Sequence, residues 1–150
     1  MYFYDLNAKI NLTVNDNNRL FVSGYFGKDV FGFEDIMGTD WGNTTFTGRW
    51  NHIFGDKLFS NTSLIYSDYD YGFKVSNFIA MSSGIDNYTF KQDFSYFPSP
   101  NLTSKIGFNV TSYQFNPGKL TTGSDSLDFR LVMDEQHSVE SGMYFSNEHK

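Results

Sequence analysis

The residues best suited to bind a ligand lie within eight positions of one another, where three carboxylates accompany aromatic side chains. They are Glu34, Asp35, Asp40 and Trp41. Carboxylates can hold a cation or accept hydrogen bonds from sugar hydroxyls, and an aromatic ring offers an apolar surface to a sugar. The alternative, which we favour, is that these are solvated charges of a surface loop beside aromatic rings that pack at its rim.

Other catalytic or metal-binding combinations are missing from the sequence. The chain has no cysteine, which excludes disulfides, thiolate metal sites and cysteine nucleophiles. His52, His137 and His149 form no pair at metal-ligand spacing. There is no Gly-x-Ser-x-Gly nucleophile motif, and the acidic stretches near Asp68 and Asp125 lack the ligand spacing of a calcium loop. We therefore expect no enzyme activity, no cofactor and no metal site.

Composition narrows the class of protein further. The 150 residues carry a formal net charge of -6 and include 17 Phe and 10 Tyr. This length suits one domain, residues 1–150. The negative balance argues against nucleic acid, which is bound chiefly through Lys and Arg. No stretch approaches the roughly 18 to 20 apolar residues of a membrane-spanning helix.

The first element that the sequence predicts is a long β-strand. Between Tyr2 and Val14 every even position is apolar, and the odd positions from Asp5 to Thr13 are polar. Side chains alternate between the two faces of a strand, so this pattern predicts one apolar and one polar face. About 13 residues at ~3.3 Å each span roughly 43 Å, far more than an ordinary strand of about 5 to 6 residues.

The same period recurs along the chain, and the connections alternate in length. Further strands are predicted at residues 19–28, 43–54, 58–71, 86–97, 102–115 and 137–145. Residues 15–18, 55–57 and 98–101 are tight turns, and the longer connections are 29–42, 74–84 and 116–134. Short turns at one end and long loops at the other are typical of a transmembrane β-barrel. We predict an all-β fold: an antiparallel meander of about seven long strands that forms part of such a barrel.

Aromatic residues near both strand ends suit the girdles that flank the lipid-facing band of a membrane barrel. They are Trp50, Phe54, Phe59, Tyr96 and Phe97 beside the tight turns, with Tyr66, Tyr69, Tyr71 and Phe73 toward the other end. A soluble barrel would place the apolar face inside instead, and alternation alone does not separate the two. Strand length, aromatic placement and charges on the face that carries Thr and Asn favour the membrane barrel.

One strand register can be predicted in detail. If the loop at residues 98–100 closes its hairpin symmetrically, Asp93 lies opposite Lys105 and Phe90 lies opposite Phe108. Each such cross-strand pair contributes roughly 0.2 to 1 kcal/mol. A slip by one residue would place charges among Phe and Ile side chains, so we expect the faces to be firmly set.

Several stretches also carry a family resemblance: residues 3–11, 19–29, 41–45, 49–52, 93–100 and 115–118. Together they resemble the barrel of TonB-dependent outer-membrane receptors of the Bacteroidetes type. That family closes about 22 strands around an N-terminal plug. The resemblance therefore implies roughly a third of a barrel wall, and we expect the chain to be a piece of a longer receptor, without its plug or secretion signal.

The resemblance implies a place and partners as well. The parent would lie in the bacterial outer membrane and import a scarce nutrient, such as a metal chelate, a cobamide or a glycan. Its partners would be outer-membrane lipid, the rest of the barrel, the plug and, through the plug, TonB. The segment alone should not transport, because an open sheet has unpaired edges that lipid does not tolerate.

Two alternatives remain open. One is a small self-contained outer-membrane barrel, since about eight strands can close. The other is a soluble all-β carbohydrate-binding module that uses Trp41 and nearby tyrosines. The membrane interpretations predict insolubility without detergent, whereas the soluble module predicts a cooperative melt in plain buffer.

Overall fold

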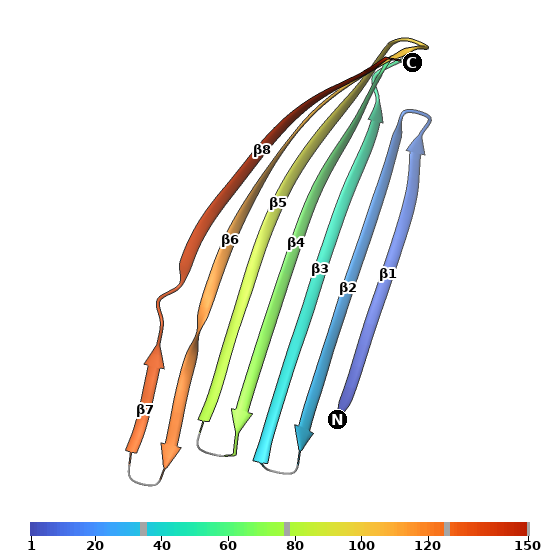
Figure 1. Cartoon of the computed structure of the whole chain (residues 1–150). Helices are drawn as coiled ribbons and strands as arrows, with labels where there is room; N and C mark the ends of the chain where they lie inside the picture. The colour runs from blue at the N-terminus through green and yellow to red at the C-terminus, as the bar shows by residue number, and fades with distance from the viewer. Residues whose placement is uncertain (34–35, 77–78, 125–126, 150) are drawn as a thin grey trace.

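All strands of the computed structural model belong to one antiparallel sheet, which curves and twists as a single layer (Figure 1). The structure describes residues 1–33, 36–76, 79–124 and 127–149, and it describes the side chains of the same residues except 123–130. The two chain ends lie on opposite edges of the sheet and at opposite ends of its strands (Figure 1). Among the described residues, no helix is long and apolar enough to cross a membrane.

The strands follow one another in sequence order, each paired with the next. They are β1 (Tyr2–Asn15), β2 (Asn18–Phe33), β3 (Met37–Ile53), β4 (Leu58–Val75), β5 (Ile79–Ser99), β6 (Leu102–Ser124), β7 (Leu127–Val132) and β8 (Gln136–His149). Both β7 and β8 pair antiparallel with β6, so they are two parts of one interrupted edge strand. The predicted antiparallel meander is thereby confirmed, and the sheet that these strands form is open.

The strands are longer than the sequence suggested, and the expectation of long irregular connections is wrong. Residues 29–33 of β2 pair with residues 37–41 of β3, and residues 71–75 of β4 pair with residues 79–83 of β5. Most of residues 116–134 likewise lies in β6 and β7. These stretches contain Gly and Asp, which have low strand propensity, but pairing with a neighbouring strand overrides such weak local preferences.

The predicted register of the β5–β6 hairpin is wrong by two residues. The pairs observed are Ser99 with Leu102, Ser95 with Lys105, Asp93 with Gly107 and Phe90 with Val110. The turn is shorter than expected, and an irregularity lies between Tyr96 and Ser99. Because the shift is even, each side chain keeps its predicted face. The rings of Phe90 and Phe108 still meet diagonally, with centroids 5.7 Å apart.

β5, β6 and the edge strand formed by β7 and β8 are all irregular at neighbouring positions. The register between β5 and β6 shifts between Ser82 and Gly84, and β7 gives way to β8 nearby. Gly118 adopts φ +130°, and its carbonyl accepts a hydrogen bond of 3.2 Å from the Met133 N–H. A Cβ at Gly118 would lie 2.7 Å from the Ser82 carbonyl oxygen, so both the conformation and the close approach require glycine.

The sheet has no hydrophobic core of its own. Among the described side chains, none that is hydrophobic is buried, and the buried ones are polar: Ser60, Ser63, Gln92 and Thr111. Domains ordinarily gain stability by packing two layers around an apolar core. A single layer with large exposed apolar side chains therefore needs an apolar environment that covers it.

Candidate functional site

The strand register sorts the side chains into two faces. We call the face with the even-numbered residues of β1–β5, and of β6 as far as Asn116, the apolar face; β8 adds its odd-numbered residues to it. The opposite face, with the remaining residues of these strands, is the polar face. The alternation first recognised between Tyr2 and Val14 thus continues across the sheet, as expected from the pleat.

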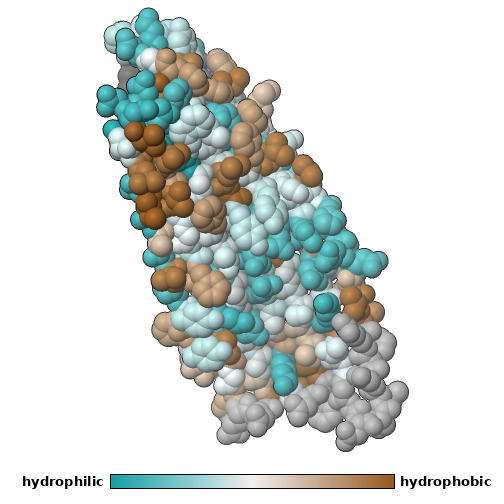
Figure 2. Space-filling view, turned by 180° about the vertical axis from the view of Figure 1, so that it is seen from behind, coloured by the Kyte–Doolittle hydropathy of each residue, from teal (hydrophilic) through white to brown (hydrophobic). Residues whose placement is uncertain are grey.

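Aliphatic and aromatic side chains form a continuous band across the apolar face. This apolar band comprises Ile10, Leu12, Leu20, Val22, Phe46, Leu64, Phe90, Phe94, Ile106, Phe108, Val110, Met143 and Phe145. Figure 2 shows this face, with apolar side chains gathered mainly over the half nearer the tight turns. Along β4, which contributes Leu64 to the band, the stretch from Leu58 at the tight-turn end to Tyr66 is nine residues long. A tilted strand needs about 9 to 11 residues to cross a bilayer.

Aromatic rings border the band at the tight-turn end. The rings of Trp50 and His52 have centroids 5.5 Å apart, and those of His52 and Phe54 are 4.3 Å apart, edge to face. The Asn18 side-chain oxygen accepts a hydrogen bond of 2.9 Å from Trp50 Nε1 and lies 2.7 Å from His52 Nδ1. Amphipathic rings that join an apolar surface to polar partners suit an interface between lipid and water.

A second pair of rings borders the band at its other end. The centroids of Tyr66 and Tyr88 lie 5.0 Å apart, and the Tyr66 hydroxyl donates a hydrogen bond of 3.1 Å to Asp86. Of the four residues predicted for a girdle here, only Tyr66 lies on the apolar face. Tyr69, Tyr71 and Phe73 have odd numbers in β4 and lie on the polar face, because strand alternation separates them from Tyr66.

Two polar side chains at the level of the band pair with each other. Thr62 donates a hydrogen bond of 2.6 Å to the side-chain oxygen of Gln92, its cross-strand partner. The Gln92 amide nitrogen in turn lies 3.4 Å from the carbonyl oxygen of Asp93. Such pairing lowers the cost of placing polar groups in an apolar environment.

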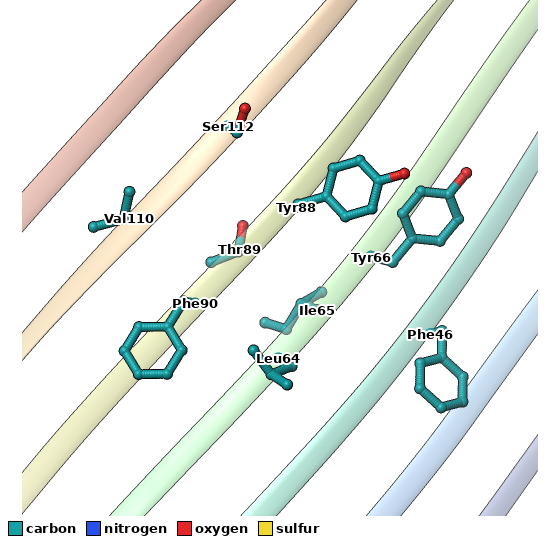
Figure 3. A pocket seen from close by; sticks show the side chains of 9 residues that line it. All are labelled: Phe46, Leu64, Ile65, Tyr66, Tyr88, Thr89, Phe90, Val110 and Ser112. Carbon is teal, nitrogen blue, oxygen red and sulfur yellow. The ribbon is translucent and has the colours of Figure 1, made fainter.

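A shallow groove opens on the apolar face between the band and the Tyr66–Tyr88 pair. It has a volume of about 400 Å³. Figure 3 shows its lining, which is Phe46, Leu64, Ile65, Tyr66, Tyr88, Thr89, Phe90, Val110 and Ser112. The rings of Phe46 and Phe90 lie on either side of Leu64, and both tyrosine hydroxyls point the same way along the strands (Figure 3).

Carboxylates lie on the apolar face just beyond the groove, and we call Asp68, Asp70 and Asp86 the acidic collar. Asp68 lies directly opposite Asp86, and Asp70 is two residues further along β4. Burial, together with repulsion from Asp70 and Asp86, raises the pKa of the Asp68 carboxyl above its ordinary value of 3.8. Gly84 leaves room for Asp70, because a Cβ there would lie 2.8 Å from the Asp70 Oδ1 atom.

An ion pair lies beside the collar. Lys28 Nζ is 3.3 Å from Asp40 Oδ2, and hydrogen bonding and charge attraction from Asp40 raise the pKa of Lys28. The Asp40 carboxylate lies against Gly72, where a Cβ would collide with it. The two side chains are about two-fifths exposed, at 40% and 43%, so the pair contributes little to stability.

The polar face carries a hydrogen-bonded contact that joins three strands. The Tyr144 hydroxyl donates a hydrogen bond of 2.8 Å to Asp93, and the tyrosine ring passes over Gly107 on the strand between them. Lys91 Nζ lies 3.6 Å from the Asp93 carboxylate. This three-strand contact depends on glycine, because a Cβ at Gly107 would collide with both the Tyr144 ring and the Asp93 carboxylate.

The structure does not bring together the residues first considered as a ligand site. Glu34 and Asp35 lie outside the described residues. Asp40 lies on the apolar face beside Lys28, whereas Trp41 lies on the polar face opposite Asp29 and Tyr71. Consecutive residues of a strand point to opposite faces, so Asp40 and Trp41 cannot grip one ligand from the same side.

The sequence alone does not reveal the groove and the collar, because their residues lie on different strands and local patterning does not fix how those strands pair. The sequence does show that each tyrosine shares a strand face with an aspartate, because Asp68 follows Tyr66 by two residues and Asp86 precedes Tyr88 by two. Only the strand register reveals that these two pairs are neighbours. Within the described part of the chain, no group of three or more His, Asp or Glu side chains is arranged to hold a metal ion.

Comparisons with protein-family models and with curated proteins find no match for this sequence.

Proposed function

We propose that the chain forms a section of the wall of an outer-membrane β-barrel, with its apolar face against lipid and its polar face toward the barrel interior. The observation that carries this proposal is the apolar band between two aromatic rows, on a single-layer sheet whose described residues bury no apolar side chain. Lipid would supply the missing apolar environment, and the polar face would meet water.

The direction of the strands supports a longer wall. Neighbouring strands alternate in direction, and β7 and β8 both run antiparallel to β6, so β8 runs the same way as β1. The two edges therefore cannot join as an antiparallel pair. A closed antiparallel barrel needs an odd number of further strands between them, which agrees with the even strand numbers of bacterial outer-membrane barrels.

The direction of the strands and the single layer of the sheet weigh against the two alternatives, a self-contained barrel and a soluble binding module. A self-contained barrel made from these seven strand positions would have to close through a parallel pair. A soluble binding module would have to cover the apolar band with protein, and the described residues form one layer only. Every residue of β1 and of β8 is exposed, so both edges are open to pair with additional strands.

The class of barrel that we propose is a TonB-dependent receptor for nutrient uptake, on the strength of the sequence resemblance at residues 3–11, 19–29, 41–45, 49–52, 93–100 and 115–118. In such a receptor this segment would line part of the passage around the plug. The nutrient would be a metal chelate, a cobamide or a glycan, and transport would belong to the complete receptor.

Reading the coding frame through on both sides of this segment tests the proposal. We expect a secretion signal and a plug upstream, and enough downstream hairpins to bring the total number of strands to an even value near 22. A frame that encodes only these seven strand positions would overturn the receptor assignment. A chain that melts cooperatively as a monomer in plain buffer would overturn the membrane assignment as well.

A further inference from the structure

The two faces of the sheet exchange character beyond the apolar band, at the strand ends away from the tight turns. After Tyr66, β4 carries Asp68, Asp70, Gly72 and Lys74 on the apolar face, but Tyr69, Tyr71 and Phe73 on the polar face. This stretch, residues 67–75, is nine residues long, about 30 Å. Asp, Gly and Lys do not suit lipid, so in the proposed barrel this part of the wall stands outside the bilayer and its aromatic side faces the passage.

Aromatic rings from four strands lie on the polar face at this level, and we call them the aromatic patch: Tyr25, Trp41, Tyr69, Tyr71, Tyr113 and Phe115. Trp41 lies directly opposite Tyr71, which places their Cβ atoms about 4.5–5.5 Å apart. Trp41 and Tyr69 are 38% and 43% exposed. So many exposed rings on a face that meets water mark a binding surface.

The aromatic patch is long and open. It extends from β2 to β6, which is four strand spacings or about 19 Å. At the β6 end the rings of Tyr113 and Phe115 stack at 20°, with centroids 5.7 Å apart. A strip of this shape suits an extended ligand with several flat units better than a compact one.

Unpaired polar side chains lie among the rings. Asn43 is opposite Tyr69, and Asn87 is opposite Tyr113. Asp29 lies opposite the tryptophan of the patch. The side chains of these two amides and this carboxylate form no hydrogen bond or ion pair within the described part of the chain. They are therefore free to exchange hydrogen bonds with the hydroxyl groups of a ligand.

The charge of the aromatic patch is negative. Asp5 and Asp29 lie at its level on β1 and β2. From Met1 to Asn116, the described cations on the strands of the polar face all lie on the tight-turn side of the patch: Lys9, Arg19, Arg49, Lys91 and Lys105. The patch consequently repels an anionic ligand.

We propose that the aromatic patch binds an uncharged, extended glycan as it enters the passage. Sugar rings stack on Trp41, Tyr69 and Tyr71, because the C–H face of a sugar suits an aromatic surface. Negative charge disfavours an anionic metal chelate, and the open strip disfavours a compact cobamide, which a concave pocket would enclose. This inference rests on the proposed function, because the polar face must line the passage; it adds the class of nutrient.

Trp41 itself reports on this site. The reporter chain carries Trp50→Phe, and the control chain carries Trp41→Phe, which leaves Trp50 on the apolar face. Both full chains, in phospholipid bicelles, are titrated with maltohexaose, mannohexaose, xylohexaose, a galacturonate hexamer and the anionic chelate gallium citrate. We expect at least one neutral hexasaccharide to change Trp41 fluorescence at a half-maximal concentration about tenfold below that of the galacturonate hexamer. The Trp50 signal should not respond.

Variants of the reporter chain test the assigned residues. Tyr71→Ala removes the ring opposite Trp41 and should raise the half-maximal concentration about fivefold. The matched control Phe21→Ala, on the polar face but outside the patch, should leave it unchanged. The isosteric change Asp29→Asn should narrow the difference between neutral and acidic hexamers to about threefold, which a purely structural role would not do.

No response of Trp41 to any neutral hexasaccharide, or an equal or stronger response to the galacturonate hexamer or gallium citrate, would overturn the glycan assignment. An equal loss in Tyr71→Ala and Phe21→Ala would overturn it as well. Brominated lipid in the same bicelles separates this failure from failure of the proposed function. Quenching of Trp50 but not of Trp41 would leave the proposed function standing, whereas equal quenching of both would overturn it.

Discussion

A charged side chain placed in the apolar band should lower the free energy of unfolding, whereas the same side chain on the polar face should leave it almost unchanged. Leu64 is 61% exposed on the apolar face, where it belongs to the apolar band and lines the groove. Thr47 lies on the adjacent strand, one residue from the position opposite Leu64, and faces the other way. Leu64→Arg and Thr47→Arg therefore introduce the same group at nearly the same depth on opposite faces.

The expected magnitude follows from the depth of Leu64. Arg costs about 2–4 kcal/mol at the midplane of a bilayer and about 0–1 kcal/mol near its surface. Leu64 precedes the bordering Tyr66 by two residues, within the nine-residue stretch of β4 from Leu58 to Tyr66. Its cost should therefore be about 2 kcal/mol, or roughly a 30-fold change in the folding equilibrium. Thr47→Arg should cost less than about 0.5 kcal/mol.

Urea titration of the chain in phospholipid bicelles, followed by tryptophan fluorescence, measures both free energies of unfolding. In water the difference between Leu64→Arg and Thr47→Arg should disappear, because replacing a side chain that is already more than half exposed by Arg changes the free energy of unfolding little. Equal costs for the two variants in bicelles, or a cost below about 0.5 kcal/mol for Leu64→Arg, would refute the assignment of the apolar face to lipid.

Three smaller predictions use the same titration. Gly107→Val should break the hydrogen bond from Tyr144 and cost about 1–2 kcal/mol, and its effect should shrink in a Tyr144→Phe background. Because the pKa of Asp68 is raised in the folded state, the contribution of Asp68 to stability should be fully present below its ordinary pKa of 3.8 and be lost as the pH rises through the raised value; Asp68→Asn should flatten this part of the pH profile, and an unchanged profile would contradict it. Asn18→Ala leaves Trp50 Nε1 without its partner and should cost about 1 kcal/mol, whereas no change would indicate that water replaces the amide.

The period-two pattern predicted the parts of the fold that depend on alternation alone. It assigned the faces correctly from Tyr2 to Val14 and kept Phe90 and Phe108 on one side of the sheet, even though the predicted register was two residues off. An even shift leaves the faces unchanged, so hydrophobic patterning cannot distinguish between such registers. The length of the turn decides between them, and the observed turn between Ser99 and Leu102 is tighter than the predicted loop at residues 98–100.

The candidate ligand site is harder to predict, because the composition of residues 29–42 favours a loop, whereas the structure pairs residues 37–41 with β2 and β4. In a loop, Asp40 and Trp41 could converge on one ligand, whereas in β3 they point to opposite faces. The pairing of residues 37–41 with β2 and β4 is a long-range effect that local composition does not encode. Register also assembles the acidic collar, since Asp68 and Asp86 are far apart in sequence but opposite each other in the sheet.

The proposed function requires that only one face of the sheet meets an apolar environment. A single tryptophan at Phe46 or at Thr47, each in a chain that lacks Trp41 and Trp50, compares adjacent residues on opposite faces. In micelles of a detergent with a brominated chain, we predict strong quenching of the Phe46→Trp chain and weak quenching of the Thr47→Trp chain. Equal quenching of the two, or stronger quenching at Thr47, would contradict the account.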